Sequence, residues 1–205
     1  MTNKRELCDK RYSLRDRLRL FNAIVTPTVL FGSGSWALTQ NQEKYLRTTQ
    51  RKMMRMMLGM GRRMREDASD DESPLDSGSE SPSGEDELLE SWVQWIVRTT
   101  GVAEEALKKA KVDDWITAYR VRKWRLAGHT ARRDDNRWSN LLLSWLPVGT
   151  RKQAHPVTRW RDDIEVFWAR QRQEMNLEVG EWVLYAQCRT SWEELAYEFA
   201  RQTRQ

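Results

Sequence analysis

Two acidic pairs are the residues in this sequence best suited to metal-dependent chemistry. Asp162 and Asp163 follow a basic and aromatic segment at residues 159–161, and a second pair stands at residues 134–135. Adjacent carboxylates can bind a divalent cation for phosphoryl transfer, which would make the chain a nuclease. The interpretation that we prefer places Asp162 and Asp163 in the first turn of a helix, where negative charge stabilises the helix dipole. The pair at 134–135 is then part of a turn that ends a helix.

The remaining chemical groups point away from catalysis. The sequence has no Gly-Lys-Ser/Thr phosphate-binding loop, and His129 and His155 are not at the spacing of metal ligands. Cys8 and Cys188 are too few for a disulfide framework, so we expect two reduced thiols in a protein of the nucleus or cytoplasm. No run of about 18 apolar residues is present, which predicts no transmembrane helix. We therefore expect no metal, no cofactor, no membrane partner and no enzymatic activity of the chain by itself.

Charge is distributed unevenly along the chain. The formal net charge is +5, but residues 1–65 hold 15 Lys and Arg against four Asp and Glu, whereas residues 66–90 hold 11 acidic residues and no basic one. Because this acidic run is also rich in Ser, Gly and Pro, it predicts a disordered linker over residues 66–87. Ten of the 11 Trp follow it. We therefore predict a basic helical segment over 1–65, the linker, and a Trp-rich helical domain over 88–205.

Periodic apolar residues predict a mainly α-helical chain of two helical segments joined by the linker. Capping signals place helix starts at Ser13, Thr39, Asp113 or Asp114, and Ser191. Pro27 is expected to kink or end the first helix, Gly59 to cap the second, and Gly101 to stop the helix around Trp92. The expected helices begin near residues 14, 40, 88, 102, 114, 158 and 191, and residues 28–31 are the one candidate strand.

Two stripes of basic residues step by three and four along the predicted helices. The first comprises Lys44, Arg47, Arg51 and Arg55, on a helix whose expected apolar face is Leu46, Met53 and Met57. The second comprises Arg122, Arg125, His129 and Arg132, of which the three arginines are the candidate nucleic-acid contacts. This spacing places side chains on one helix face, where Lys and Arg attract nucleic-acid phosphates. The alternative is a solvated helix face. It weighs more for the second stripe, which lies among Trp residues, than for the first, which has no acid between its ends.

Four segments resemble, in order, the region that follows the polymerase palm in non-LTR (LINE-type) retrotransposon reverse transcriptases. The first runs from Leu18 to Gly32 and continues as Trp36-Ala37-Leu38-Thr39, and the second, residues 46–59, is similar to the helix that follows in the family. Residues 122–129 are similar to its Arg-Leu-x-Trp-x-Gly-His element, with residues 133–137 after it. Residues 159–164 resemble its Arg-Trp-x-Asp-Asp-Ile element.

The resemblance implies a helical thumb followed by a helical C-terminal segment, a region that holds the template–primer duplex in the family. It therefore implies duplex contacts for Arg47, Arg51 and Arg55. The palm motif Tyr/Phe-x-Asp-Asp, the endonuclease domain and the Cys/His zinc knuckle of the family are absent from this sequence. Polymerase activity is therefore not carried over by the resemblance.

These observations lead to one hypothesis and two rivals. The leading hypothesis is a fragment of an RNA-directed DNA polymerase that binds RNA/DNA or RNA duplex through backbone phosphates and relies on a polymerase palm elsewhere. The first rival is a helical protein-interaction module that uses its Met-rich and Trp-rich faces. The second is a metal-dependent nuclease that uses Asp162 and Asp163.

Overall fold

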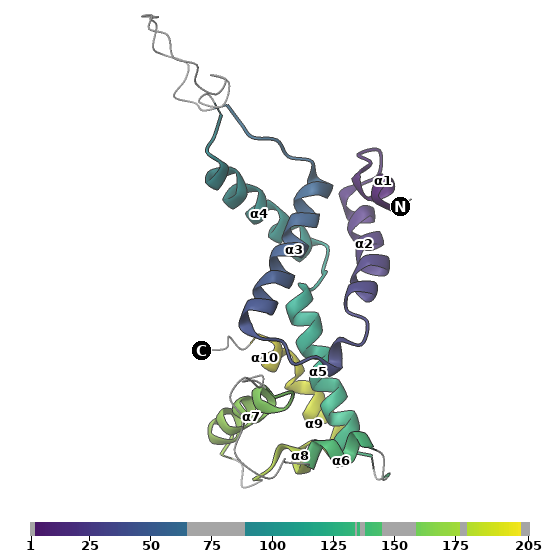
Figure 1. Cartoon of the computed structure of the whole chain (residues 1–205), viewed down its shortest axis with the longest axis vertical. Coiled ribbons are helices and arrows are strands. Elements are labelled where there is room, and N and C mark those ends of the chain that lie inside the picture. The colour runs from purple at the N-terminus through teal and green to yellow at the C-terminus, as the bar shows by residue number, and fades with distance from the viewer. Residues whose placement is uncertain are drawn as a thin grey trace, which may run out of the picture. The chain divides into compact units, whose positions relative to one another are not determined.

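The chain is helical in the computed structural model, which describes residues 3–64, 89–133, 135, 138–144, 159–176 and 180–201 (Figure 1). The elements are α1 (Asn3–Cys8), α2 (Leu14–Val29), the 3-10 helix η1 (Ser33–Ser35), α3 (Gln40–Leu58), α4 (Trp92–Lys109), α5 (Trp115–Ala131), α6 (Trp138–Ser144), α7 (Asp162–Glu174), α8 (Trp182–Tyr185), α9 (Arg189–Glu194) and α10 (Ala196–Arg201). The described residues form no strand, and none of their helices is long and apolar enough to cross a bilayer. The prediction of a mainly α-helical chain is confirmed; the predicted linker, residues 66–87, lies outside the described residues.

Backbone hydrogen bonds confirm three of the predicted helix boundaries. α3 begins at a capping box, in which the Thr39 N–H donates to Gln42 Oε1 at 2.8 Å and the Gln42 N–H donates to Thr39 Oγ1 at 3.4 Å. It ends before Gly59, whose φ of +59° lies in the left-handed region that favours glycine. α5 begins after Asp114, whose carboxylate accepts two N–H groups of the first turn at 2.7 and 2.9 Å.

The end of α2 differs from the prediction. The helix continues through Pro27 to Val29, because a proline so close to the end interrupts little of the remaining hydrogen-bond ladder, and the Leu30 N–H still donates to Thr26 O at 2.9 Å. The candidate strand at residues 28–31 is wrong. Thr28 lies in α2 and donates its hydroxyl to Ile24 O at 2.7 Å.

Two other predicted boundaries are also wrong. α4 passes through Gly101 without stopping, and its C-terminal turn is closed by Lys111, which adopts a φ of +55°. The last predicted helix does not start at Ser191, because the Cys188 carbonyl already accepts the Trp192 N–H at 3.1 Å and α9 begins at Arg189. α10 follows α9 as a separate helix.

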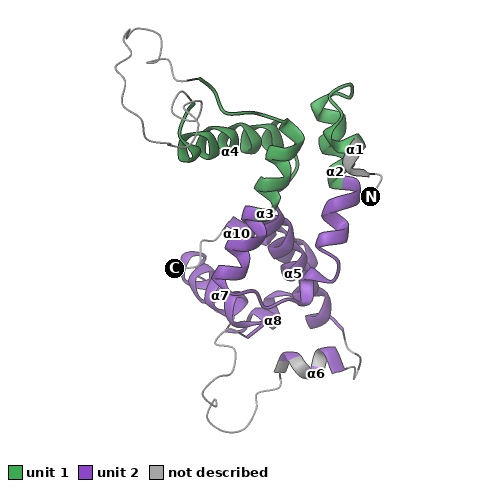
Figure 2. Cartoon of the chain, turned by 45° about the horizontal axis from the view of Figure 1, so that its top comes forward, with its two compact units in different colours: residues 1–22, 49–112 green, residues 23–48, 113–205 purple. Residues whose placement is uncertain are grey.

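Packing divides the chain into two compact units (Figure 2). Unit 1 consists of residues 1–22 and 49–112, and unit 2 consists of residues 23–48 and 113–205. Each unit therefore joins two segments that are distant in the sequence.

The core of unit 1 is formed by apolar side chains of α2, α3 and α4. Its buried apolar residues are Leu18, Phe21, Met54, Met57, Ala103, Leu107 and Val112. Arg17 is buried with them and donates from Nη1 to Met57 O at 2.6 Å, which satisfies a carbonyl at the end of α3. The Trp95 indole donates to Met60 O at 3.0 Å and holds the chain that leaves α3.

A pairing between two chain segments closes one end of unit 1. Met64 and Leu89 form an isolated antiparallel bridge, and the Glu90 N–H donates to Arg63 O at 2.7 Å. The Glu90 carboxylate forms an ion pair with Arg98, and the hydrogen bond from that guanidinium lowers the pKa of Glu90 below its ordinary value. The residues on either side of the acidic run are thus held together.

The core of unit 2 is aromatic and is organised around α5. Trp124 is fully buried, and Phe167 and Phe199 lie with their ring centroids 5.2 and 4.9 Å from it. Ile164 and Trp168 of α7 are buried in the same cluster. Trp115, Ile116 and Tyr119 of α5 are also buried, while Leu126 is only half-buried.

Candidate nucleic-acid interface

The basic helix α3 turns its only acidic residue inward. Glu43 is buried in unit 2, and its Oε2 accepts a hydrogen bond from Arg120 Nη2 at 2.6 Å. The side chains of this pair are only 10% and 9% exposed, so the negative charge is neutralised inside the unit. As a result, all the exposed charge that α3 contributes is positive.

Two cations of the first predicted stripe lie in unit 2. Lys44 and Arg47 are exposed, and neither forms an ion pair with another described residue. Their positive charge is therefore available to an anionic ligand. Contact of these two residues with nucleic acid stays a prediction.

The other two cations of the first stripe lie in unit 1 and have partners there. Arg51 forms an ion pair with Glu104 of α4, and Arg55 donates from Nη1 to Thr100 Oγ1 at 3.0 Å. Lys52 is exposed between them and was missed by the sequence reasoning. Lys44, Thr48 and Lys52 are spaced four residues apart and are all exposed. This spacing places Lys52 on the same helix face as Lys44 and could have identified it.

The apolar face of α3 is displaced by one residue from the predicted one. Met57 is buried as predicted, but Met54 is buried and Met53 is only half-buried. Leu46 is also half-buried. The change brings Gln50 onto the buried face and moves Arg51 and Arg55 toward α4.

The second predicted stripe binds the protein itself. Arg122 donates to Leu30 O at 2.7 Å, just after the end of α2, and Arg132 donates to Ala186 O at 2.8 Å. Arg125 forms an ion pair with Glu193 of α9. All three contacts lie within unit 2. These arginines therefore stabilise the packing of α5; Arg122 and Arg132 are half-buried, and Arg125 is exposed.

The segments that carry the family resemblance contact one another in unit 2. The Trp160 indole donates to Gly34 O at 2.7 Å, so the last motif binds the turn of the first. Lys123 Nζ lies 2.8 Å from Asp163 Oδ1 and 5.6 Å from the centroid of the Trp160 ring. These residues therefore fix the fold of unit 2.

The acidic pair of α7 has structural partners. Asp162 Oδ2 accepts the Arg159 N–H at 2.6 Å, and Asp163 pairs with the buried Lys123. Both lie in the first turn of α7, which confirms the preferred interpretation. No group of three or more His, Cys, Asp or Glu able to hold a metal occurs in the part of the chain that the structure describes. Of the other pair, Asp134 lies outside the described residues.

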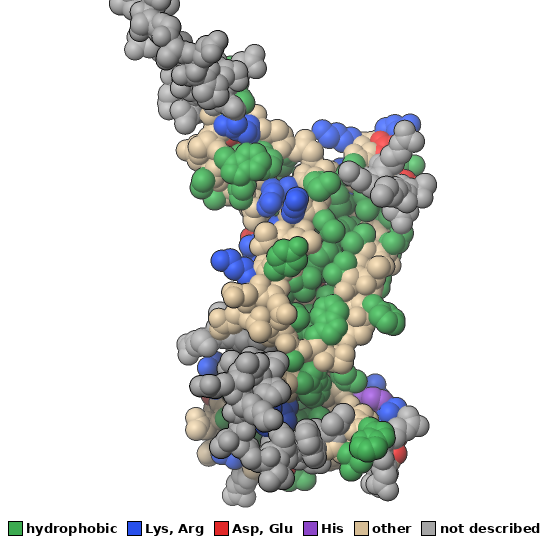
Figure 3. All heavy atoms as spheres, viewed as in Figure 1, with side chains coloured by type: hydrophobic (Ala, Val, Ile, Leu, Met, Phe, Trp, Pro, Cys, Tyr) green, Lys and Arg blue, Asp and Glu red, His purple; other side chains and the backbone are tan. Residues whose placement is uncertain are grey.

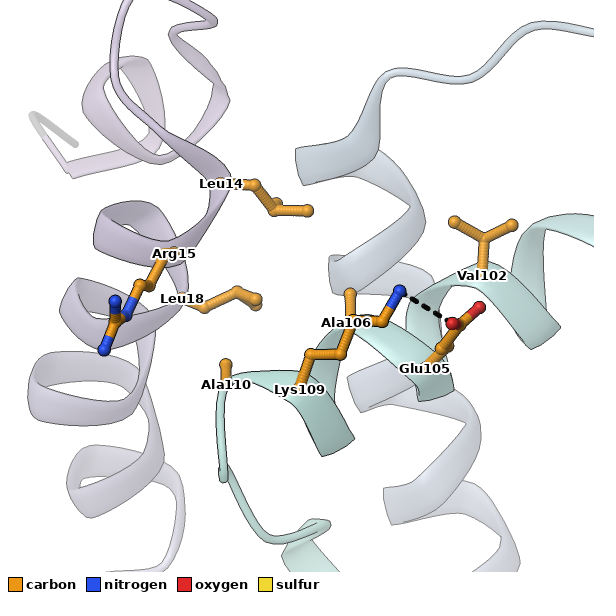
Figure 4. A pocket seen from close by; sticks show the side chains of 8 residues that line it. All are labelled: Leu14, Arg15, Leu18, Val102, Glu105, Ala106, Lys109 and Ala110. Atoms are coloured by element: carbon orange, nitrogen blue, oxygen red, sulfur yellow. Dashed lines mark ion pairs between the residues drawn. The ribbon is translucent and has the colours of Figure 1, made fainter.

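A cavity of about 300 Å³ opens in unit 1 between α2 and α4 (Figure 4). Leu14 and Leu18 point into it from α2, and Val102, Ala106 and Ala110 line it from α4. The only charged groups near it are Arg15, which points away, and the ion pair of Lys109 with Glu105 at 2.7 Å. Such an apolar lining does not suit phosphate.

On the face shown in Figure 3, Lys and Arg side chains are visible beside hydrophobic ones and carboxylates are sparse.

Comparison with known proteins identifies one distant relative, a protein of Caenorhabditis elegans whose name describes it as transposon-derived and uncharacterized. The two are 24% identical over 149 residues, which covers 72% of this chain and 42% of the relative. The chain thus spans less than half the length of that protein. No family model and no solved structure matches the chain. The chain is therefore similar, at a distance, to a protein of transposon origin.

Proposed function

We propose that the chain is a nucleic-acid-binding fragment related to the thumb and C-terminal region of a non-LTR retrotransposon reverse transcriptase, and that α3 binds the template–primer duplex. The observation that carries the proposal is the burial of Glu43 against Arg120, which leaves Lys44, Arg47 and Lys52 exposed on a helix without an exposed acid. The transposon-derived relative supports an origin in a mobile element.

In this proposal, the Lys and Arg side chains of α3 bind the phosphates of the duplex backbone. Lys and Arg side chains replace counterions condensed on the duplex, and their release into solution favours binding. Arg51 and Arg55, on the part of α3 that lies in unit 1, can also contact phosphate, because a guanidinium carries five N–H donors and the bonds to Glu104 and Thr100 leave others. Contacts of this kind read the backbone, so the proposal includes no strong sequence preference.

The proposed role is duplex binding without catalysis. The carboxylates of α7 are held by Arg159 and Lys123, and the sequence contains no palm motif. Nucleotide transfer then requires a palm supplied by another chain or segment. Purified protein is expected to give no extension of a primed template with Mg²⁺; extension by the protein alone would overturn this part of the proposal.

The test is fluorescence anisotropy with a blunt RNA/DNA hybrid across a salt series. Changing Lys44, Arg47 and Lys52 together to Gln is expected to weaken binding. The slope of log affinity against log salt concentration is expected to become shallower by about 2 to 3, because three phosphate contacts are lost. A matched control changes three exposed cations away from α3, Lys108, Arg170 and Arg189, to Gln. It removes the same charge but is expected to change the slope much less. Equal effects of the two variants would show that α3 is not the contact surface.

A second candidate function, protein interaction, is favoured by the exposed apolar side chains of unit 1. Trp92, Val93 and Val97 of α4 are 60, 70 and 66% exposed, and the cavity beside Leu14 is also apolar. Exposed apolar patches of this kind mark interaction surfaces. If the α3 variant binds duplex as the parent chain does, and Trp92→Ser with Val97→Ser changes the oligomeric state in light scattering, this function takes precedence.

A further inference from the structure

A hollow of about 310 Å³ lies in unit 2 beside the first turns of α3. Its walls are mostly apolar and include two aromatic rings and two side-chain amides; they are formed by Trp36, Leu38, Asn41, Gln42, Tyr45 and Leu46. The Tyr45 side chain is 76% exposed, so one wall is an aromatic ring that faces solvent. The volume is at the lower end of the range of small-molecule sites, which begins at about 300 Å³.

Two of the residues that line the hollow with Tyr45 are held in place by their own contacts. The Trp36 ring stacks on Tyr119 with centroids 6.3 Å apart, and the Tyr119 hydroxyl donates to Trp36 O at 3.1 Å. Gln42 is fixed by the capping box with Thr39. The hollow therefore exists before any ligand binds, and a ligand does not have to order these side chains.

The charge around the hollow favours an anionic ligand. Between Gln40 and Thr48, α3 carries three charged residues, and the one acid among them, Glu43, is buried against Arg120. Lys44 directly precedes Tyr45, and Lys44 and Arg47 are both exposed, three residues apart on one face of the helix. A hollow with two aromatic rings beside positive charge matches a nucleotide better than it matches an apolar or acidic peptide.

We propose that this hollow binds an unpaired base next to a duplex, with the base stacked on Tyr45 and Trp36 and its phosphate near Lys44. The inference rests on the proposed duplex binding by α3. A base within a duplex is covered on both faces by its neighbours, so only an unpaired base offers a face to Tyr45. Stacking on aromatic rings tolerates every base, and the amides of Asn41 and Gln42 can hydrogen-bond base edges.

The experiment compares a blunt RNA/DNA hybrid with the same hybrid carrying a three-nucleotide single-stranded overhang. In fluorescence anisotropy at one salt concentration, the parent chain is expected to bind the overhang form about 5- to 150-fold more tightly, the range expected for stacking of one base on an aromatic side chain. Tyr45→Ala is expected to abolish this preference and to leave blunt-duplex affinity unchanged. Tyr45→Phe retains the ring and is expected to retain the preference.

A matched control is Phe31→Ala, since Phe31 is an aromatic residue of unit 2 that is 85% exposed but does not line the hollow. It is expected to retain the preference for the overhang. Equal binding of the two hybrids by the parent chain, or equal loss in the Phe31→Ala and Tyr45→Ala variants, overturns the hollow as the base site while blunt-duplex binding still supports α3. Absence of binding to both hybrids overturns the proposed function together with this inference.

Discussion

The indole rings of Trp124 and Trp192 stack 3.8 Å apart at an angle of 5°, and each donates a hydrogen bond to the backbone carbonyl of the other, at 2.7 and 2.9 Å. Both indole N–H groups are thus satisfied in the interior of unit 2, where an unpaired donor would be costly. Gly128, one turn after Trp124 on α5, makes room for the second ring. Trp124 and Gly128, both in the segment 122–129 that resembles the family, therefore act together to seat α9 on α5.

Gly128→Ala is expected to lower the free energy of unfolding by about 1–3 kcal/mol, because a Cβ at this position would lie 2.3 Å from Trp192 Nε1. Urea unfolding followed by Trp fluorescence measures the effect. Gly101→Ala is the matched control, since Gly101 is also helical but has nothing within 4 Å of the position of a Cβ. There the gain in helix propensity is expected to leave the chain as stable or more stable. Similar results for the two variants would contradict this account of Gly128.

Lys123→Met is expected to destabilise the chain by about 3–5 kcal/mol, because it leaves the carboxylate of Asp163 without its partner. Lys123 is fully buried, so solvent does not replace the lost ammonium. Adding Asp163→Leu to this variant is expected to restore much of the loss, as measured by thermal unfolding. Lys109→Met, which breaks the exposed pair with Glu105, serves as the control and is expected to have little effect. A double variant no more stable than the single one would disprove the pairing.

Cys188 is expected to react with iodoacetamide at about half its maximal rate near pH 7. Hydrogen bonds from Ser191 and Thr190, whose hydroxyls lie 3.1 and 3.3 Å from its sulfur, lower its pKa to about 7. Because the thiolate reacts, the rate rises with pH through that value. Ser191→Ala removes the larger cause and is expected to move the midpoint upward. The measurement uses a Cys8→Ser background, and an unchanged midpoint in the Ser191→Ala variant would argue against this explanation.

Deletion of residues 66–86 is expected to leave the helical circular dichroism signal nearly unchanged and to tighten duplex binding. The deleted run contains nine of the chain's 30 acidic residues and no basic one, and these acids can compete with phosphate for Lys44 and Arg47. The antiparallel bridge of Met64 with Leu89 is outside the deletion and keeps the flanking segments paired. A large loss of helix would show that the acidic run contributes to folding. Unchanged affinity would show that it does not compete for the basic helix.

The helical segments with strong local signals could be predicted from the sequence. The limits of α3 were given by the capping box at Thr39 and by Gly59, because both act through neighbouring backbone groups. Gly101 misled the prediction, since a glycine in a helix is unfavourable by only about 1 kcal/mol and the packing of Ala103 and Leu107 outweighs it.

The candidate interface was harder to predict than the helices. Spacing places Arg51, Arg55 and Arg122 on helix faces, but it cannot show that Glu104, Thr100 and the Leu30 carbonyl lie opposite them. These partners come from segments distant in the sequence. The sequence also offered no sign that Trp36 and Tyr45 border one hollow, because this depends on how the chain turns between them.

The bridge between Met64 and Leu89 has a consequence for how the chain can change in length. Once the two flanks are held together, the entropy cost of the connection between them grows only with the logarithm of its length, by about 0.6 kcal/mol for each doubling. Insertions or repeats between these two residues are therefore nearly neutral for folding. The same position is a suitable place to insert a fluorescent reporter or a tethered partner domain without rebuilding either unit.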